Sequence, residues 1–428
     1  MTPMSDDPRR LLMVAFHYPP DNTSTGVLRT LKFTQYLEEF GWMCDVLSVP
    51  ETLYSSTDPA SLEKIPDAVR VHRAWANDIK KISSIRGLYP AFLGVPDRYW
   101  LWIWPALRQA KRLLRGDHPF KAVFSTYPVP SALLIGLLLK KRHGLPWIAD
   151  FRDPWVEDSM AGWEKLVGAR IERAVLEQAD RVVCNTPRMR EWFMQRYPQV
   201  DADKLVTIPN GYDARELAEV IPAPLKKFQI FYGGVIDGEN RNPRPLLAGV
   251  RHAIDQGWID ASQLHITFLG AGAYGVGAAF TQDVERLRLQ DYIELCEQRI
   301  PYAQALQRAA GADVILVLSE ALGDDEAAEK ERQWSRLQVP VKVYEGLGMQ
   351  RQILALVSDG AAKDILTETR SGVAVPPTDV EGIARALRRL YERWQAGSSA
   401  EAADQAQLEK YSRKSLAGRL AATLDELV

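Results

Sequence analysis

Residues 340–356 read Pro-Val-Lys-Val-Tyr-Glu-Gly-Leu-Gly-Met-Gln-Arg-Gln-Ile-Leu-Ala-Leu. A proline-bounded turn, a helical turn ending at Gly346 and Gly348, and an apolar run predict a helix beside a strand edge, where ligands bind in open α/β sheets. Lys342 and Glu345 fall at the helix N-terminus, whose N–H groups suit a phosphate, while a carboxylate can accept two hydrogen bonds from a ribose diol. The alternative is an ordinary Lys–Glu surface pair.

The rest of the chain repeats this alternation of short apolar runs and helical patterns. We expect first-half strands at residues 11–16, 44–49, 122–125, 147–149, 181–184 and 205–208. Helices are expected at residues 28–40, 105–114, 131–142, 163–178 and 188–196. A second series has strands at residues 229–232, 265–269, 292–295, 314–318, 353–357 and 373–375, and a last helix at 416–427. Such alternation is typical of parallel, doubly wound sheets, and it predicts two Rossmann-like halves joined near residue 220.

Size and composition agree with a two-domain globular protein. The chain has 428 residues, 46% of them hydrophobic and 25% charged, and a net charge of −2, which gives no general attraction to nucleic acid. Its three cysteines show no metal-ligand spacing and predict reduced thiols. The N-terminus lacks a signal-peptide pattern, and no apolar stretch approaches the roughly 20 residues that a membrane-spanning helix needs. A cytoplasmic location is expected.

Three further segments carry candidate binding residues. After the first strand, His17-Tyr-Pro-Pro and a polar loop lead to Gly26 and a helix that carries Arg29. This geometry suits a phosphate or an acceptor, and the alternative is a plain turn with Arg29 in a salt bridge.

Asp150, Arg152 and Asp153 follow another strand. Burying three charges so close together costs free energy unless they serve a function or pair with other groups.

In the second half, the strand at 229–232 leads into Gly233-Gly234, and Arg241 follows. Glycines let the backbone approach a ligand closely, and an arginine can pair with an anionic group through two hydrogen bonds.

Two other segments have unusual compositions. Residues 99–115 combine tryptophans with a basic helix, so they could sit at a membrane surface, although core packing of most of these rings is the alternative. Residues 321–338 are so rich in charge that a solvated loop or lid is expected there. The acidic run at its start is presented by no strand and has no histidine near it, so no metal site is expected.

Together, these segments resemble family 4 glycosyltransferases, enzymes of the GT-B fold. Residues 340–345 match Pro-x-Lys-x-x-Glu, and residues 150–155 match the Asp-x-Arg-Asp-Pro-Trp motif of a bacterial branch. The opening at residues 18–29 is similar to Tyr-Pro-Pro…Gly-Gly…Arg, with Thr25-Gly26 in place of the double glycine, and residues 209–213 repeat a Pro-Asn-Gly-x-Asp turn.

The resemblance implies a GT-B architecture with two domains facing a cleft. It places an acceptor-side domain at residues 1–219, a nucleotide-sugar domain at 220–405, and a C-terminal helix at 406–428 that returns to the first domain. The implied activity is a retaining, metal-independent, hexosyltransferase-like transfer in polysaccharide or glycoconjugate biosynthesis. The donor is a nucleoside diphosphate sugar used as co-substrate without another cofactor. The acceptor is a glycan, a lipid-linked molecule or a small molecule, with peripheral contact at the inner membrane face.

The resemblance also implies residue roles. Gly26, Gly234, Arg241, Lys342 and Glu345 would bind the donor, with Glu345 on the ribose and the two cations on the diphosphate. A histidine that other members place beside the sugar is absent, so Asp150 or Asp153, with Arg152, is the catalytic candidate. A closed pair between Arg152 and a carboxylate is the structural alternative.

One further departure bears on function. Many members carry a second glutamate near the sugar, and Leu337 stands at that position. Two rival interpretations therefore remain open. One is a GT-B nucleotide-sugar epimerase, and the other is a non-catalytic interaction protein on a degenerate GT-B fold.

Overall fold

The computed structural model describes residues 9–24, 26–83, 90–156, 160, 162–237, 241–270, 277–298, 300–320, 322–323, 325–397 and 404–428. The described chain divides into two compact units. Unit 1 comprises the residues up to Asn210 together with Arg413–Val428, and unit 2 comprises Gly211–Ser412.

The change of unit at Asn210 comes earlier than residue 219. The reason is that Tyr212 pairs with the end of unit 2, where its N–H donates to the Tyr411 carbonyl at 3.0 Å.

Unit 1 contains a parallel sheet whose seven described strands run in the order β3-β2-β1-β4-β5-β6-β7. The strands are β1 Arg9–Ala15, β2 Trp42–Ser48, β3 Arg70–Arg73, β4 Phe120–Thr126, β5 Trp147–Phe151, β6 Arg181–Cys184 and β7 Leu205–Thr207. The order reverses between β1 and β4, which makes the C-terminal ends of these two strands the switch point where ligands bind in doubly wound sheets.

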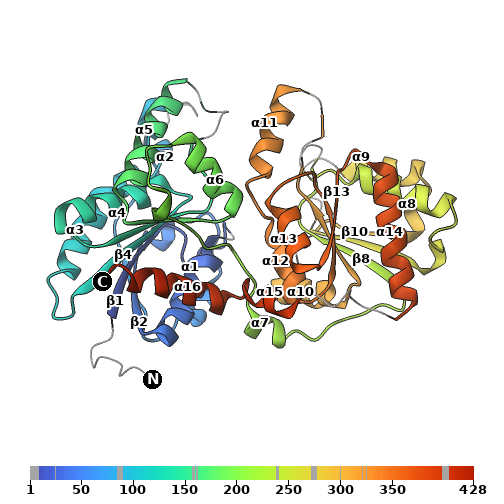
Figure 1. The fold of residues 1–428 in the computed structure, drawn as a ribbon, viewed down its shortest axis with the longest axis horizontal. Coiled ribbons are helices and arrows are strands. Elements are labelled where there is room, and N and C mark those ends of the chain that lie inside the picture. Colours follow the sequence, from blue (N-terminus) through green and yellow to red (C-terminus); the bar gives the residue numbers. More distant parts are fainter. Residues whose placement is uncertain are drawn as a thin grey trace. The chain divides into compact units, whose positions relative to one another are not determined.

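Helices cover both faces of this sheet (Figure 1). They are α1 Gly26–Tyr36, α2 Ile79–Ser83, α3 Ile103–Leu113, α4 Pro130–His143, α5 Gly162–Gln178, α6 Pro187–Arg196 and α16 Arg413–Asp425. Alternate residues of β1 serve the two faces: Leu12 and Val14 join the core under α3 to α6, whereas Leu11 and Met13 pack toward α1 and α16. The C-terminal helix thus returns to the first sheet, and Leu420 is fully buried there.

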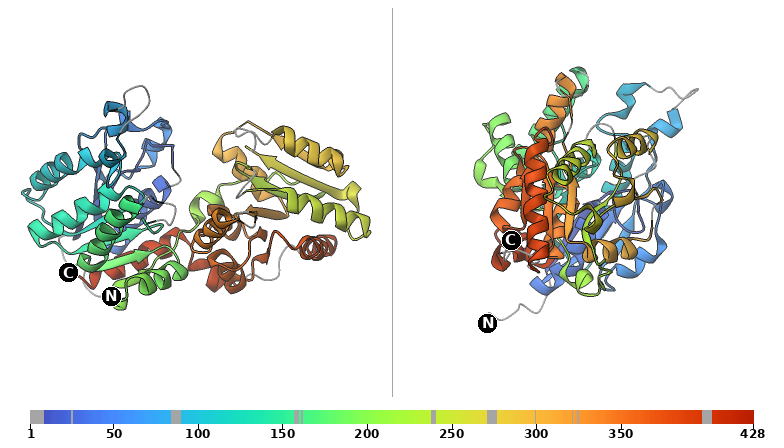
Figure 2. Two further views of the ribbon diagram at one scale, coloured as in Figure 1. Left: turned by 90° about the horizontal axis from the view of Figure 1, so that it is seen from above. Right: turned by 90° about the vertical axis from the view of Figure 1, so that its right-hand side faces the viewer.

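Unit 2 has a second parallel sheet, of six described strands in the order β10-β9-β8-β11-β12-β13. The strands are β8 Phe228–Gly233, β9 Leu264–Leu269, β10 Ile293–Cys296, β11 Val314–Leu318, β12 Gln352–Leu356 and β13 Gly372–Val375. The helices are α7 Ala214–Ala218, α8 Arg244–Asp255, α9 Gly277–Arg286, α10 Tyr302–Gly311, α11 Glu326–Ser335, α12 Val341–Gly348, α13 Ala361–Thr369, α14 Val380–Gln395 and α15 Gln405–Glu409. Helices again flank the sheet (Figure 2). Two apolar cores lie on its opposite faces, and the switch point falls between β8 and β11.

Some elements differ from the expectations, among them β3, α11 and the short helices α2, α7 and α15. Strand β3 was not predicted, because it is a charged edge strand whose His72 Nε2 contacts Asp45 Oδ2 at 2.7 Å instead of presenting an apolar run. The expected loop at 321–338 contains helix α11. Asp325 caps this helix by accepting from the Ala328 N–H at 2.8 Å, and Lys330 pairs with Glu326 one turn away.

No helix in the described part of the chain is long and apolar enough to cross a lipid bilayer.

Candidate functional site

Lys342 and Glu345 project from the start of α12 in unit 2. Pro340 is the N-cap residue, and Val343, Tyr344 and Leu347 form the buried face of the helix. Since these three occupy the core-facing positions, Lys342 and Glu345 lie one turn apart on the less buried face, near the switch point of the second sheet. The sequence predicted this placement.

Gly234 follows β8 directly and lies against Lys342. Its φ is +144°, a conformation that side chains rarely adopt, and a Cβ at this position would lie 2.8 Å from Lys342 Nζ. The Lys342 ammonium also lies 5.0 Å from the centroid of the Tyr232 ring. A residue other than glycine would therefore displace the lysine from the C-terminal end of β8.

The charges of this group of residues are perturbed by the surrounding protein. Burial lowers the pKa of Lys342; the Glu345 carboxylate opposes this shift and the Arg241 charge adds to it. Burial likewise raises the pKa of Glu345, against the effects of Lys342 and of a hydrogen bond from Tyr302. Both side chains are nevertheless only half-buried by exposed area, so they are surrounded by protein yet reached by solvent. Groups placed in this way are typical of binding sites.

Tyr302 is a member of the site that the sequence analysis missed. It is the first residue of α10, and its hydroxyl donates to Glu345 Oε1 at 3.1 Å. This bond fixes one carboxylate oxygen, while the Tyr302 side chain remains half exposed. A tyrosine at a helix start carries no local signal, because its partner lies 43 residues further along the chain.

The two arginines after β8 have different surroundings. Arg241 is exposed, and its charge acts on both Lys342 and Tyr232. Arg244 instead pairs through Nε with Asp283 on α9. Arg241 is therefore the one of the two that the structure brings near Lys342.

In unit 1, Asp150 is fully buried at the end of β5. Its Oδ2 accepts from Arg29 Nε at 3.0 Å and from Thr126 Oγ1 at 2.6 Å, and its Oδ1 accepts from Arg29 Nη2 at 2.7 Å. Arg29 is thus in the salt bridge that was the alternative reading of this segment. Asp150 pairs with Arg29, and its oxygens face the interior of the unit.

Arg152 lies across the start of α1. A Cβ added to Gly26 would lie 2.0 Å from Arg152 Nη1, so a glycine is needed for this close approach. Burial lowers the pKa of Arg152, Asp153 opposes the shift, and the enclosed Nε has no hydrogen-bond partner among the described residues. A guanidinium beside a helix N-terminus forms a place for an anionic group.

A histidine–aspartate pair at the end of β1 was also missed. His17 Nδ1 contacts Asp21 Oδ2 at 2.5 Å, and Asp21 Oδ1 accepts from the Thr23 N–H at 2.8 Å. Burial alone would raise the pKa of Asp21, but the hydrogen bonds from His17 and Thr23 outweigh it and lower this pKa. The pair was visible in the sequence only as polar residues after the first strand.

The aromatic segment at 99–115 divides between core and surface. Trp102 is completely buried, and Trp100 donates through Nε1 to the Leu93 carbonyl at 2.8 Å. Trp104 is 61% exposed, with the Arg142 guanidinium 5.2 Å from its ring centroid. On α3, Arg108, Lys111 and Arg112 are exposed.

Among the described residues, no group of three or more His, Cys, Asp or Glu side chains is arranged to hold a metal ion. Cys44 and Cys184 are buried thiols, and Cys296 is half-buried.

Comparison with known proteins gives a family match for part of the chain. Residues 26–211 match the family described as "Glycosyl transferase 4-like domain". No curated protein sequence matches this chain.

Solved structures match over nearly the whole length. A glycosyltransferase from Rickettsia africae has a TM-score of 0.67 at 14% identity, covering 99% of both chains. Anabaena Alr3699/HepE in complex with UDP has a TM-score of 0.65 at 13% identity, covering 97% of this chain and 100% of that one. An α,α-trehalose-phosphate synthase (UDP-forming) from Burkholderia xenovorans in complex with glucose-6-phosphate has a TM-score of 0.67 at 13% identity, covering 97% and 100%. The chain therefore has the GT-B fold, as its two parallel sheets and returning C-terminal helix indicated.

Proposed function

We propose that this protein is a glycosyltransferase that moves a sugar, expected to be a hexose, from a nucleoside diphosphate sugar to a hydroxyl group of an acceptor. The observation that carries the proposal is the placement of Lys342 and Glu345 in the first turns of α12, with Lys342 against Gly234 at the end of β8. The family match in unit 1 supports it, as do similar structures that hold UDP or UDP-glucose.

In this proposal unit 2 binds the nucleotide. Glu345, held by Tyr302, accepts hydrogen bonds from the ribose hydroxyls, and Lys342 and Arg241 contact the diphosphate. When the bond between the anomeric carbon and the diphosphate oxygen breaks, its electron pair stays on the leaving group. Two preplaced cations stabilise that charge most effectively where water is partly excluded. Gly234 leaves the space in which they can do so.

Unit 1 would contribute the acceptor-side groups. Arg152, beside Gly26 and the N-terminus of α1, offers a place for an anionic group, and Asp153 and His17 are candidates for contacts to hydroxyls. Asp150 would act as a positioning residue through Arg29. We propose retention of the anomeric configuration, no metal requirement, and a role in polysaccharide or glycoconjugate biosynthesis.

A peripheral membrane contact is part of the proposal for a lipid-linked acceptor. The exposed Trp104 ring and the exposed cations of α3 are the residue types that favour an anionic lipid surface.

Glu345→Ala is the sharpest test of the nucleotide site. A thermal-shift panel of nucleoside diphosphates would first identify the preferred base, because a ligand at 100 times its Kd adds about 2.7 kcal/mol of stability. Calorimetry with that diphosphate should then show roughly ten- to hundredfold weaker binding by the variant, since charge-assisted hydrogen bonds contribute about 1.5 to 3 kcal/mol. Glu381→Ala, which removes an exposed glutamate from α14, should bind as the parent does.

Unchanged binding by Glu345→Ala would remove this residue from the site. Two other outcomes would replace the proposed function. Release of a free sugar epimer without any acceptor would identify an epimerase. A parent protein that no nucleotide stabilises would instead be a non-catalytic protein on this fold.

A further inference from the structure

Unit 2 contains a pocket at the opposite end of its sheet from Gly234. The pocket has a volume of about 250 Å³ and is lined by the first residues of three strands, Phe228 of β8, Val314 of β11 and Gln352 of β12, together with residues from α14. Because the strands are parallel, their N-terminal ends meet at one edge, and the C-terminal ends with Gly234 lie at the other. This pocket is therefore separate from the proposed nucleotide site.

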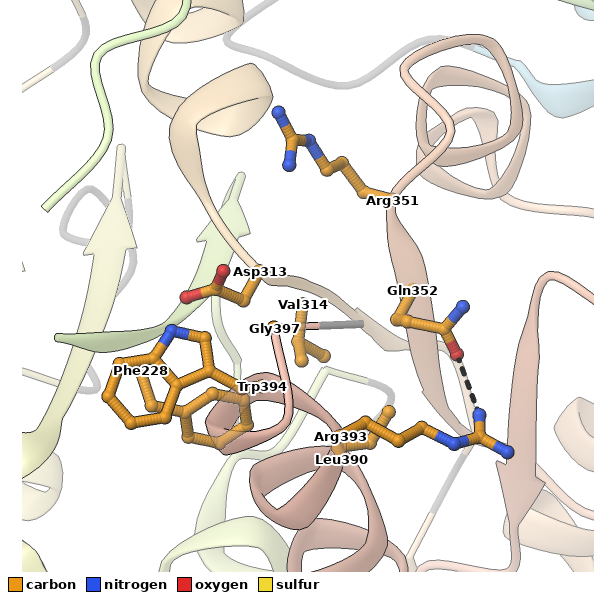
Figure 3. A pocket seen from close by; sticks show the side chains of 9 residues that line it. All are labelled: Phe228, Asp313, Val314, Arg351, Gln352, Leu390, Arg393, Trp394 and Gly397. Carbon is orange, nitrogen blue, oxygen red and sulfur yellow. Dashed lines mark hydrogen bonds between the residues drawn. The ribbon is translucent and has the colours of Figure 1, made fainter. Parts of the chain in front are cut away.

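The cations of the pocket are held by local structure. The Arg351 N–H donates to the Gly346 carbonyl at 3.0 Å, which fixes the residue in the turn between α12 and β12. Its side-chain Nε is enclosed and has no hydrogen-bond partner among the described residues. A buried donor without a partner is unfavourable, and more so when it is charged. Arg393 donates through Nη1 to Gln352 Oε1 at 3.4 Å (Figure 3).

Aromatic side chains form one wall of the pocket. Trp394 stacks on Tyr391 with ring centroids 5.5 Å apart, and its centroid lies 5.9 Å from that of the buried Phe228. In Figure 3 the Phe228 and Trp394 rings lie on one side of the pocket and the Arg393 guanidinium on the other. The pocket thus offers a flat apolar surface together with positively charged donors.

Asp313 restricts the charge that the pocket can accept. Its Oδ2 accepts from the Gln229 N–H at 2.8 Å, so the carboxyl is fixed at the N-terminal end of β11. Arg351 is close enough to Asp313 for the two to interact electrostatically. The two guanidinium groups and this carboxylate together carry one net positive charge, which a singly charged anion would balance.

We infer that this pocket binds a small organic monoanion with a flat apolar body, an aromatic carboxylate being the simplest example. Its carboxylate pairs with the Arg351 guanidinium, and its ring lies against Trp394. The volume, about 250 Å³, is below the range of drug-sized ligand sites, and a nucleoside diphosphate sugar would not fit.

Calorimetry of the full chain with phenylacetate tests the inference. We expect saturable binding of phenylacetate. Acetate, which lacks the aromatic ring, and benzyl alcohol, which lacks the carboxylate, should each bind at least tenfold more weakly. Arg351→Gln and Trp394→Leu should each weaken phenylacetate binding at least tenfold. The matched control is Arg389→Gln, which removes an exposed arginine from α14, the helix that carries Trp394, and should bind as the parent does.

Several outcomes would overturn the inference. These are no saturable binding by the parent up to about 10 mM phenylacetate, equal binding by parent and Arg351→Gln, or tighter binding of the dianion phenyl phosphate. If Arg351→Gln does not fold, Arg351→Lys keeps the charge but loses the planar guanidinium, and it should also weaken binding. Glu345→Ala should bind phenylacetate as tightly as the parent does. The test of this pocket is therefore independent of the test of the nucleotide site.

Discussion

Arg29 and Asp150, 121 residues apart in the sequence, form a two-point ion pair in the interior of unit 1, with side-chain exposures of 1% and 0%. The Arg29 guanidinium also donates to the carbonyls of Ile208 and Pro209, both at 2.9 Å. One side chain thus joins the start of α1, the end of β5 and the chain after β7. These contacts fix the loops at the C-terminal edge of the first sheet, where Arg152 and Asp153 lie.

Asp150→Asn is therefore expected to destabilise unit 1. The substitution keeps the shape but leaves the Arg29 charge buried without its partner, which typically costs about 3 to 5 kcal/mol. Urea unfolding followed by tryptophan fluorescence would measure the loss. Glu381→Gln is the control, because it removes the partner of Arg385 in an exposed pair and should cost less than about 1 kcal/mol.

Asp153→Asn provides the contrast at the same loop. Asp153 is only half-buried, so this variant should keep the stability of the parent and lose turnover if the carboxylate meets a substrate. An Asp150→Asn protein as stable as the parent, with reduced turnover, would instead return the catalytic role to Asp150.

The affinity for a nucleoside diphosphate should depend on pH on both sides of an optimum. Lys342 must be protonated to attract the diphosphate, and burial lowers its pKa, so binding should weaken as pH rises at lower values than for an ordinary lysine. Glu345 must be ionised to accept from the ribose, and burial raises its pKa, so binding should also weaken as pH falls, starting above the usual glutamate range. Calorimetry across pH would record both limbs.

Single substitutions distinguish the titration of Glu345 and Lys342 from the titration of the nucleotide itself. Glu345→Gln should remove the part of the acidic limb that belongs to the protein, and Lys342→Met should flatten the alkaline limb. If the two variants weaken binding equally at every pH, these residues do not titrate in the binding reaction.

Helix α3 should bind anionic membranes weakly and in a salt-dependent way. Each exposed Lys or Arg near such a surface contributes about 1 kcal/mol, within a Debye length of about 10 Å at 0.1 M salt. Replacing Arg108, Lys111 and Arg112 with glutamine should therefore reduce flotation with phosphatidylglycerol vesicles by on the order of a hundredfold in affinity. The matched control replaces three exposed arginines of α14, namely Arg385, Arg388 and Arg389. Equal flotation with phosphatidylcholine vesicles at low salt would argue against this contact.

Local sequence patterns were enough to predict the two parallel sheets and the position of Lys342 and Glu345 at the start of a helix. These features follow from local patterns: apolar runs of strand length, helical periodicity, and a proline that starts a helix. The same local rules failed for β3, whose charged residues pack at a sheet edge, and for α11, whose charges are paired along the helix.

The pairing of the charged side chains, in contrast, depends on how the chain folds in three dimensions. Asp150 was expected to act on a substrate or to pair with Arg152, but it pairs with Arg29, because the order of the strands brings the end of β5 near the start of α1. In the same way, Tyr302 reaches Glu345, and Arg152 comes to lie over Gly26. The partner of a buried charge depends on the strand order and on the free-energy cost of burying that charge unpaired. The residues next to it in the sequence show neither.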